Sequence, residues 1–142
     1  MNIVFIITRS DAIGGAHIHV RDMSVNLIRE GHTVTVVLGG AGLYIDWLTK
    51  ANIPLVKSIH LARKISPLND LFALFELKRI LRAIKPDIVS THSAKAGLLG
   101  RLAASSLNLP VIYTAHGWPF ADGVSSFHSS LYIFLERKLS KK

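Results

Sequence analysis

Short runs of apolar, mostly β-branched residues alternate along the chain with longer segments in which apolar residues recur every three or four positions. The short runs are unbroken and too short for helices, which is typical of strands buried on both faces. We predict strands at residues 2–8, 33–38, 53–59, 87–91 and 110–115. We predict helices at residues 16–30, 43–51, 67–84, 94–107 and 127–139. This alternation predicts an α/β fold with a doubly wound, mainly parallel sheet.

The length and composition fit one globular domain. The chain has 142 residues, of which 49% are hydrophobic and 18% charged, and no linker, repeat or low-complexity segment divides it. We therefore predict a single Rossmann-like domain over residues 1–142. The lack of cysteine excludes disulfides, thiol nucleophiles and cysteine-ligated metals. The N-terminal run lacks the basic start of a signal peptide, and no apolar run is as long as a transmembrane helix, so we expect a cytoplasmic domain.

Basic residues outnumber acidic ones, with 17 Lys and Arg against 9 Asp and Glu and a net charge of +8. Such an excess favours an anionic partner, which can be a nucleic acid, a phosphorylated small molecule or an acidic membrane face. We expect no nucleic acid, because the basic residues show neither interleaved aromatic residues nor helix-turn-helix spacing. Charge alone does not choose between the other two partners.

Basic residues lie beside and within the helix predicted at residues 67–84: Arg63, Lys64, Lys78, Arg79, Arg82 and Lys85. A helix of this kind could rest on the anionic inner face of a membrane. The simpler interpretation, which we favour, is that Leu71, Phe75 and Ile84 face the core while the charges face water. Peripheral membrane contact is the alternative.

Ligands bind such sheets in the crevice beyond the carboxyl ends of the strands. The loop that follows the first strand ends with Gly14 and Gly15 at the start of a helix, where free backbone N–H groups and the helix dipole favour an anion. We predict that these glycines let a phosphate approach the backbone. The alternative is a tight turn that needs a positive φ.

Two common chemistries do not fit the sequence. The dinucleotide fingerprint is absent, because its glycine spacing is missing and the second strand ends in Leu38 and Gly39 rather than in an acidic residue. The P-loop is missing too. Among the seven histidines, His17 and His19 lie roughly 200° apart around a helix and cannot hold one ion together, so we predict no metal site.

The loops after the fourth and fifth strands hold the other candidates. Ser93 is placed to cap the next helix, and Lys95 in its first turn opposes the helix dipole, which suggests an anionic ligand. A solvated lysine is the alternative. His116, like His92, closes a strand at the ligand edge. Trp118 and Phe120 follow His116 and suit stacking on a sugar or base; packing beneath the loop is the alternative.

Four segments together resemble the N-terminal half of the family 4 glycosyltransferases of the GT-B fold, which are retaining enzymes of polysaccharide and lipid-linked glycan assembly. The segments are GGAHIHVRDM (14–23), GHTVTVV (31–37), KPDIVSTHSAKAGLLGRLAA (85–104) and PVIYTAHGWPF (110–120). The last two are the specific ones. The resemblance implies a two-domain enzyme whose N-terminal half shapes the acceptor site, and whose C-terminal, donor-binding half is absent from this chain.

The resemblance also implies roles for particular residues. Gly15, next to Gly14, would lie near the donor diphosphate, and His116 would contact the transferred sugar and support the reaction. Lys95, in the same segment as Ser93, would face the acceptor or a phosphate. The aromatic residues Trp118 and Phe120 would line the acceptor side.

The implied reaction is transfer of a sugar from a nucleotide-sugar to a glycan or lipid-linked acceptor with retention of configuration. It implies no metal or other cofactor, since helix dipoles and basic side chains would stabilise the leaving diphosphate. We expect the chain to be inactive alone. Two alternatives stay open: a free-standing nucleotide or carbohydrate-phosphate binding module without catalysis, and a flavodoxin-like regulatory domain, whose phosphoacceptor form lacks its acidic residues here.

Overall fold

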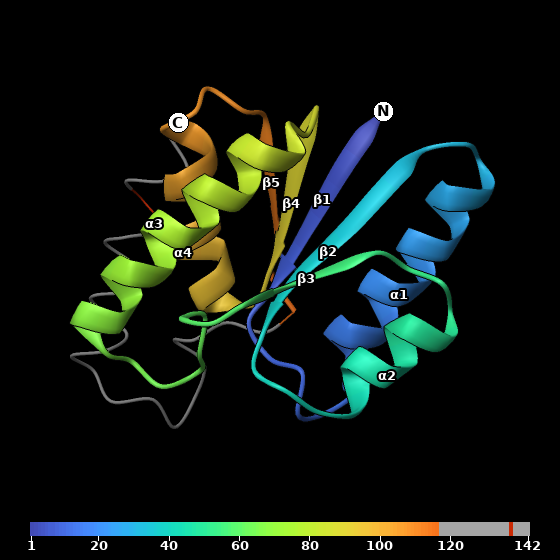
Figure 1. The fold of residues 1–142 in the computed structure, drawn as a ribbon, viewed down its shortest axis with the longest axis horizontal. Helices are drawn as coiled ribbons and strands as arrows, with labels where there is room; N and C mark the ends of the chain where they lie inside the picture. The colour runs from blue at the N-terminus through green and yellow to red at the C-terminus, as the bar shows by residue number, and fades with distance from the viewer. Residues whose placement is uncertain (117–136, 138–142) are drawn as a thin grey trace.

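In the computed structural model, which describes residues 1–116 and 137, strands and helices alternate strictly along the chain (Figure 1). They are β1 (Asn2–Ile7), α1 (Gly15–Arg29), β2 (Thr33–Gly39), α2 (Leu43–Lys50), β3 (Leu55–Ser58), α3 (Pro67–Ile84), β4 (Ile88–His92), α4 (Ala94–Ser105) and β5 (Val111–Thr114). The predicted elements up to residue 115 are all present. The helix predicted at residues 127–139 lies outside the described residues, apart from residue 137.

The five strands form one parallel sheet in the order β3-β2-β1-β4-β5. The chain first moves outward from β1 through β2 to β3, and then crosses back to continue from β4 to β5. The strand order therefore reverses at β1, and the crevice beyond the carboxyl ends of β1 and β4 is where such sheets bind ligands. The predicted doubly wound fold is confirmed.

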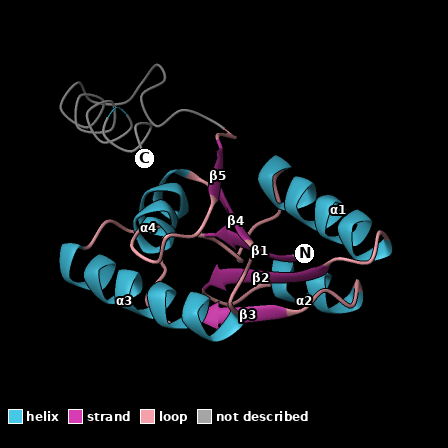
Figure 2. Ribbon diagram, turned by 90° about the horizontal axis from the view of Figure 1, so that it is seen from above, coloured by secondary structure: helices cyan, strands magenta, loops and turns pink. Residues whose placement is uncertain are grey.

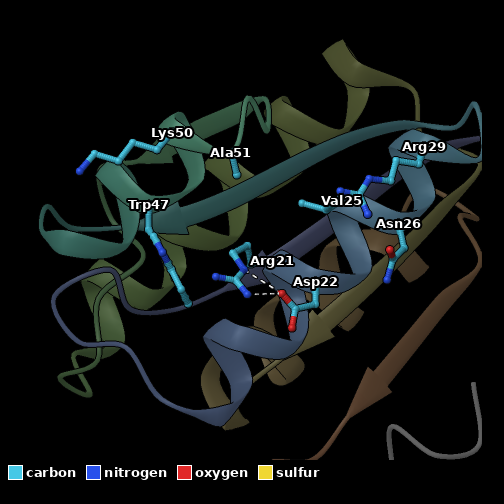
Figure 3. Close-up of a pocket in the computed structure, with 8 residues that line it drawn as sticks. All are labelled: Arg21, Asp22, Val25, Asn26, Arg29, Trp47, Lys50 and Ala51. Atoms are coloured by element: carbon cyan, nitrogen blue, oxygen red, sulfur yellow. Dashed lines mark hydrogen bonds and ion pairs between the residues drawn. The ribbon is translucent and has the colours of Figure 1, made fainter.

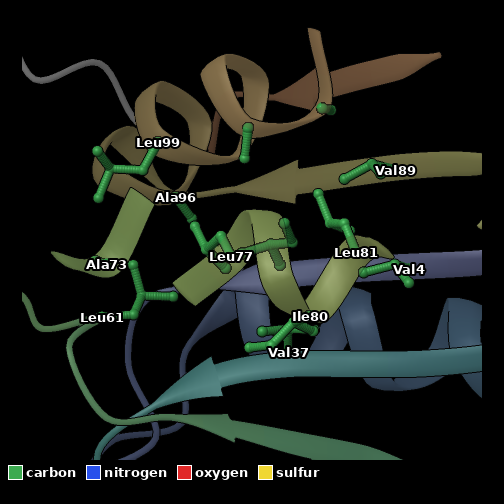
Figure 4. Close-up of a cluster of buried hydrophobic side chains, with 13 residues drawn as sticks. Val4, Val37, Leu61, Ala73, Leu77, Ile80, Leu81, Val89, Ala96 and Leu99 are labelled. Carbon is green, nitrogen blue, oxygen red and sulfur yellow. The ribbon is translucent and has the colours of Figure 1, made fainter. Parts of the chain in front are cut away.

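Helices cover both faces of the sheet, with α1 and α2 on one face and α3 and α4 on the other (Figures 1 and 2). In β1, Phe5 packs in the cluster beneath α1 and α2, whereas Val4 and Ile6 pack in the cluster beneath α3 and α4 (Figure 4). Each fully buried side chain of this size contributes about 1.5–3 kcal/mol to folding. Burial on both faces explains why the strand sequences are apolar without alternation.

Two glycines of α4 let this helix lie close to the sheet. A Cβ on Gly97 would stand 2.5 Å from the Tyr113 ring, and one on Gly100 would stand 2.6 Å from Cγ2 of Thr91. Both distances are shorter than any real carbon contact, so alanine at either position forces a shift of the helix or of its neighbour. Part of the segment that resembles glycosyltransferases therefore serves packing.

The helix α3 carries apolar residues on two sides. Ala73, Leu77, Ile80 and Leu81 pack on the sheet (Figure 4). Ile84 is partly buried and packs at the edge of the same cluster. A second group faces outward with exposed fractions of 48–75%: Leu68, Leu71, Phe72 and Phe75. The prediction that Leu71 and Phe75 face the core was wrong, because helical spacing does not tell which of two apolar stripes meets the sheet. None of the helices in the described part of the chain is long and apolar enough to cross a membrane.

Candidate functional site

Thr8 stands where the strand order reverses, directly after β1, and links this strand to the start of α4. Its hydroxyl oxygen accepts a hydrogen bond from the backbone N–H of Ala96 at 3.2 Å and lies 2.7 Å from the hydroxyl oxygen of Ser93. Ser93 occupies the N-cap position of α4, but its side chain makes no capping hydrogen bond. The prediction that Ser93 caps α4 was therefore wrong. The hydroxyl that accepts a hydrogen bond from an N–H group of α4 belongs to Thr8.

The backbone of Ser93 is held in a conformation that side chains disfavour. Its φ is 84° and its ψ is 152°, a region populated almost only by glycine. Such strain costs about 1–3 kcal/mol and is kept only where the surroundings enforce it. Here it stands at the ligand edge of the sheet, between His92 and the first turn of α4.

We expect Ser93→Gly to be more stable than Ser93→Ala by about 1 kcal/mol. Both variants lose the hydrogen bond with Thr8, but only glycine relieves the strain of about 1–3 kcal/mol, against which its extra freedom in the unfolded chain costs about 0.5–1 kcal/mol. Urea unfolding of the two variants measures the difference. An alanine variant as stable as the glycine variant would show that the backbone at this position is not strained.

Gly14 and Gly15 lie at the start of α1, where the fold does not require glycine at either position. Gly14 is the N-cap with an extended φ of −140°, and neither glycine has a positive φ, so the tight-turn alternative is excluded. A Cβ on Gly15 would meet nothing within 4 Å, and one on Gly14 would meet only Nδ1 of His17 at 4.0 Å. The first turn of α1 holds no acidic residue, so its positive end is not neutralised there. These features support the predicted phosphate contact, which stays a prediction.

His17 is a buried histidine that fixes the loop between β1 and α1. The backbone N–H of Gly14 donates to its Nδ1 at 3.2 Å, so the ring proton is on Nε2, which donates to the carbonyl of Arg9 at 3.3 Å. The ring also meets the Tyr44 ring edge to face, with the ring centres 4.7 Å apart. Burial lowers the pKa of His17 below its usual value. This histidine holds the glycines in place and faces away from solvent.

Three other histidines converge at the carboxyl edge: His19 from α1, His92 from the end of β4, and His116 after β5. Nδ1 of His92 lies 2.9 Å from Nε2 of His116, and Nε2 of His92 lies 3.0 Å from Oγ of Ser90. The ring centre of His19 lies 5.5 Å from that of His92 and 5.2 Å from that of His116. We call these three residues the histidine cluster.

The members of the histidine cluster differ in their environment. His92 is 1% exposed, while His19 and His116 are exposed. Burial, with the nearby His116 and His19, lowers the pKa of His92 to about 3. Burial and then His19 and His17 also lower the pKa of His116. Because these shifts favour the uncharged ring, His92 is neutral at physiological pH and His116 is biased toward its neutral form.

Sequence reasoning placed His92 and His116 at this edge but missed His19. It was right that His17 and His19 do not act together, since His17 turns inward and His19 turns toward β4 and β5. The available signal was topological: α1 follows β1, and β1 pairs with β4. A histidine in the second turn of α1 can therefore reach the carboxyl end of β4.

Lys95 already has an anionic partner within the chain. Its ammonium group lies 2.6 Å from Oδ1 of Asp70 in the first turn of α3 and also donates to the carbonyl of Lys64. Lys95 thus turns toward α3, on the face of the sheet opposite to α1 and His19. The structure does not bring Lys95 to His116, and its contact with an acceptor or phosphate stays a prediction. Trp118 and Phe120 lie outside the described residues.

A small cavity of about 240 Å³ opens beyond the ends of β1 and β2, beside the loop that precedes α1. Its lining includes Arg9, Asp11 and Arg63. Arg9 and Asp11 form a two-pronged ion pair at 2.8 and 2.9 Å. The hydrogen bond from Arg9 holds the pKa of Asp11 well below its usual value. The cavity therefore presents a neutralised pair with Arg63 as an additional cation.

A larger pocket of about 580 Å³ lies between α1 and α2 (Figure 3). The guanidinium group of Arg21 stacks on the Trp47 ring at 3.9 Å and donates to the carboxylate of Asp22. The side chains of Arg29 and Lys50 also line it. This pocket is formed by the later turns of both helices, away from the carboxyl edge that carries His116.

Comparison with known proteins decides the family. Residues 13–142 match the family described as Glycosyltransferase Family 4. The chain belongs to glycosyltransferase family 4. This confirms the resemblance to family 4 that the four sequence segments indicate.

Two relatives from Escherichia coli show how this family 4 chain compares with longer proteins. It is 32% identical over 139 residues to the O-antigen biosynthesis glycosyltransferase WbnH, covering 98% of this chain and 38% of WbnH. It is 40% identical over 77 residues to UDP-Gal:alpha-D-GlcNAc-diphosphoundecaprenol alpha-1,3-galactosyltransferase, covering 54% of this chain and 20% of that enzyme. The chain thus spans well under half the length of these relatives.

A solved structure supports the fold of this family 4 chain. The HepE protein of Anabaena, crystallised in complex with UDP, superposes with a TM-score of 0.75 at 19% identity. The match covers 97% of this chain and 35% of HepE. At this identity the likeness shows the fold alone.

Proposed function

We propose that this protein transfers a sugar from a nucleotide-sugar to a glycan or lipid-linked acceptor with retention of configuration, and that residues 1–142 form the acceptor-side half of the cleft. The observation that carries the proposal is the start of α1, where Gly14 and Gly15 leave a bare, positively polarised surface that folding does not require. Family membership and the names of the relatives, one of which acts on a lipid-linked diphosphate, agree with it.

In this proposal the donor diphosphate approaches Gly15, and a second domain holds the nucleotide. The backbone N–H groups and dipole at the start of α1 stabilise the negative charge that grows on the leaving diphosphate, so no metal is needed for that step. His116 faces the transferred sugar. His92, buried and hydrogen-bonded to Ser90, fixes the position of His116 through the 2.9 Å contact between their rings.

A panel of nucleotide-sugars, assayed with the complete enzyme, tests the proposal. We expect release of a nucleoside diphosphate that depends on a lipid-linked or glycan acceptor, and negligible turnover by residues 1–142 alone, because half of the cleft is missing. Tight nucleotide-sugar binding without turnover by the complete enzyme would favour the binding-module alternative. Turnover by residues 1–142 alone would contradict the division of the cleft.

We also propose that an anionic membrane surface covers the exposed side of α3. The side chains concerned, which we call the α3 patch, are Ile65, Leu68, Leu71, Phe72 and Phe75, with exposed fractions of 48–75%. Exposed cations flank the patch: Arg63, Lys64, Arg79, Arg82 and Lys85. Apolar side chains with basic neighbours are the combination that binds anionic lipid surfaces.

The position of the α3 patch supports a lipid-linked acceptor. The pairing of Asp70 with Lys95 places the first turn of α3 beside the first turn of α4, which starts at the carboxyl end of β4. The patch therefore begins at the same edge of the sheet as the candidate site. A membrane against it would present a lipid-linked acceptor next to the cleft.

Replacing Phe72 and Phe75 together with serine should lower retention on anionic liposomes by about tenfold or more, because two large apolar contacts are lost. Cosedimentation with phosphatidylglycerol vesicles measures this, and raised salt should weaken binding further by screening the cations. Ile112→Ser is the matched control, since Ile112 is 53% exposed on β5, outside the patch. Unchanged retention would exclude a membrane role. A wild-type dimer that becomes a monomer in the double variant would also exclude it, because a second copy of the chain would then cover the patch.

A further inference from the structure

The histidine cluster brings three potential metal ligands close together. One ring nitrogen from each of His19, His92 and His116 lies within 4.8 Å of the other two. In a tetrahedral zinc site, with Zn–N distances of about 2.0–2.1 Å, neighbouring nitrogens stand about 3.3 Å apart. The present separation of 2.9 Å between His92 and His116 would open by a few tenths of an ångström. His19 and His116 are exposed and can make that adjustment, while His92 is fixed.

The surroundings of His92 orient it as a ligand. Oγ of Ser90 engages its Nε2 at 3.0 Å, which leaves Nδ1 directed at the cluster. Hydrogen bonds of this kind to the far nitrogen fix the ring orientation of metal-binding histidines.

The donor set selects the class of ion. Three imidazoles, with neither a carboxylate nor a thiolate among the clustered ligands, suit Zn²⁺, Co²⁺, Ni²⁺ or Cu²⁺ and do not suit Mg²⁺ or Ca²⁺. Three protein ligands leave a fourth position open. Because His19 and His116 are exposed, that position is reached from solvent.

We propose that His19, His92 and His116 bind a divalent transition-metal ion of the Zn²⁺ class, and that the bound ion blocks the surface that His116 offers to the sugar. The first part concerns binding alone. The second part rests on the proposed function, because it needs His116 to face the transferred sugar. The ion is an inhibitor in this scheme and is not needed for transfer.

Cobalt binding tests the site without any activity. The protein, freed of any polyhistidine tag, is titrated with Co²⁺, and the visible absorption of a four-coordinate ion is followed, with Zn²⁺ as the competitor. We expect about one equivalent to bind. His19→Asn, at an exposed position, should weaken binding at least roughly 100-fold, and Ser90→Ala about tenfold, since removing such supporting hydrogen bonds costs 10–100-fold.

The matched control is His32→Asn, because His32 lies at the opposite end of the sheet beside Met1. Circular dichroism checks that each variant is folded. Equal Co²⁺ affinity in the wild type and His19→Asn, or loss of binding in His32→Asn, would overturn the site.

Inhibition tests the second part. Zn²⁺ should inhibit turnover by the complete enzyme, and His19→Asn, compared with its own metal-free rate, should need roughly 100-fold more Zn²⁺ for the same inhibition. If Co²⁺ binds as expected and Zn²⁺ does not inhibit, the blocking role is overturned while the site stands. If no nucleotide-sugar is turned over at all, the proposed function fails, and the Co²⁺ titration still decides the metal site.

Discussion

Replacing Gly15 with alanine is expected to leave the protein folded and to reduce kcat/KM for the nucleotide-sugar by at least about 100-fold. The added Cβ meets no atom of the chain within 4 Å, and the backbone has no positive φ there. Alanine is favoured over glycine in helices by up to about 1 kcal/mol, so the melting temperature should stay or rise. A methyl group that displaces the diphosphate by about 1 Å is enough for a loss of this size.

The contrast with Gly97→Ala makes this result interpretable. Gly97 is also in a helix, but its Cβ would stand 2.5 Å from the Tyr113 ring, so its variant should lose stability and activity together. Steady-state kinetics and thermal unfolding of both variants measure the two quantities. A Gly15→Ala enzyme with unchanged kcat/KM would remove the start of α1 from the donor site.

Replacing His116 with alanine is expected to lower turnover by at least about 100-fold, the effect of removing one polar group that stabilises a transition state. The stability loss should be small, about 1 kcal/mol, because His116 is exposed and water can replace its hydrogen bond with His92. Turnover should therefore fall far more than the melting temperature does.

The control for His116 is again His32, whose ring contacts the N-terminal amino group at the amino edge of the sheet. His32→Ala should keep its turnover. Single-turnover measurements separate a slower transfer step from weaker donor binding. A His116→Ala enzyme with wild-type turnover would exclude His116 from the reaction, whatever its effect on melting.

The fold was predictable because burial on both faces leaves a strong mark on the strands. From Ile3 to Ile7 the strand β1 is an unbroken apolar run, and a run of this kind fits little other than a central parallel strand. The same logic failed on α3. A helix with two apolar stripes has two ways to meet a sheet. In the structure the stripe that contains Ala73 and Leu77 packs against the sheet, so Leu71 and Phe75 point outward.

The position of the site was predictable, but its contacts were not. Gly15 and His116 were found because strand ends and helix starts are visible in the sequence. The capping role of Thr8, the partner of Lys95 and the approach of His19 depend on side chains that lie many residues apart along the chain. Such pairs are set by the strand order and by the rotation of each helix about its axis, which local patterns do not record.

The burial of most of β1 commits this strand to folding and leaves ligand contacts to the loop that follows it. From Ile3 to Ile7 each side chain is at most 7% exposed, so the strand tolerates little beyond apolar residues of similar volume. The loop that follows β1 is buried at Thr8 and Ser10, but its residues at positions 11 and 13–15 are exposed and are under no such demand. Substitutions in these exposed positions can therefore change what the carboxyl edge contacts while the sheet stays unchanged.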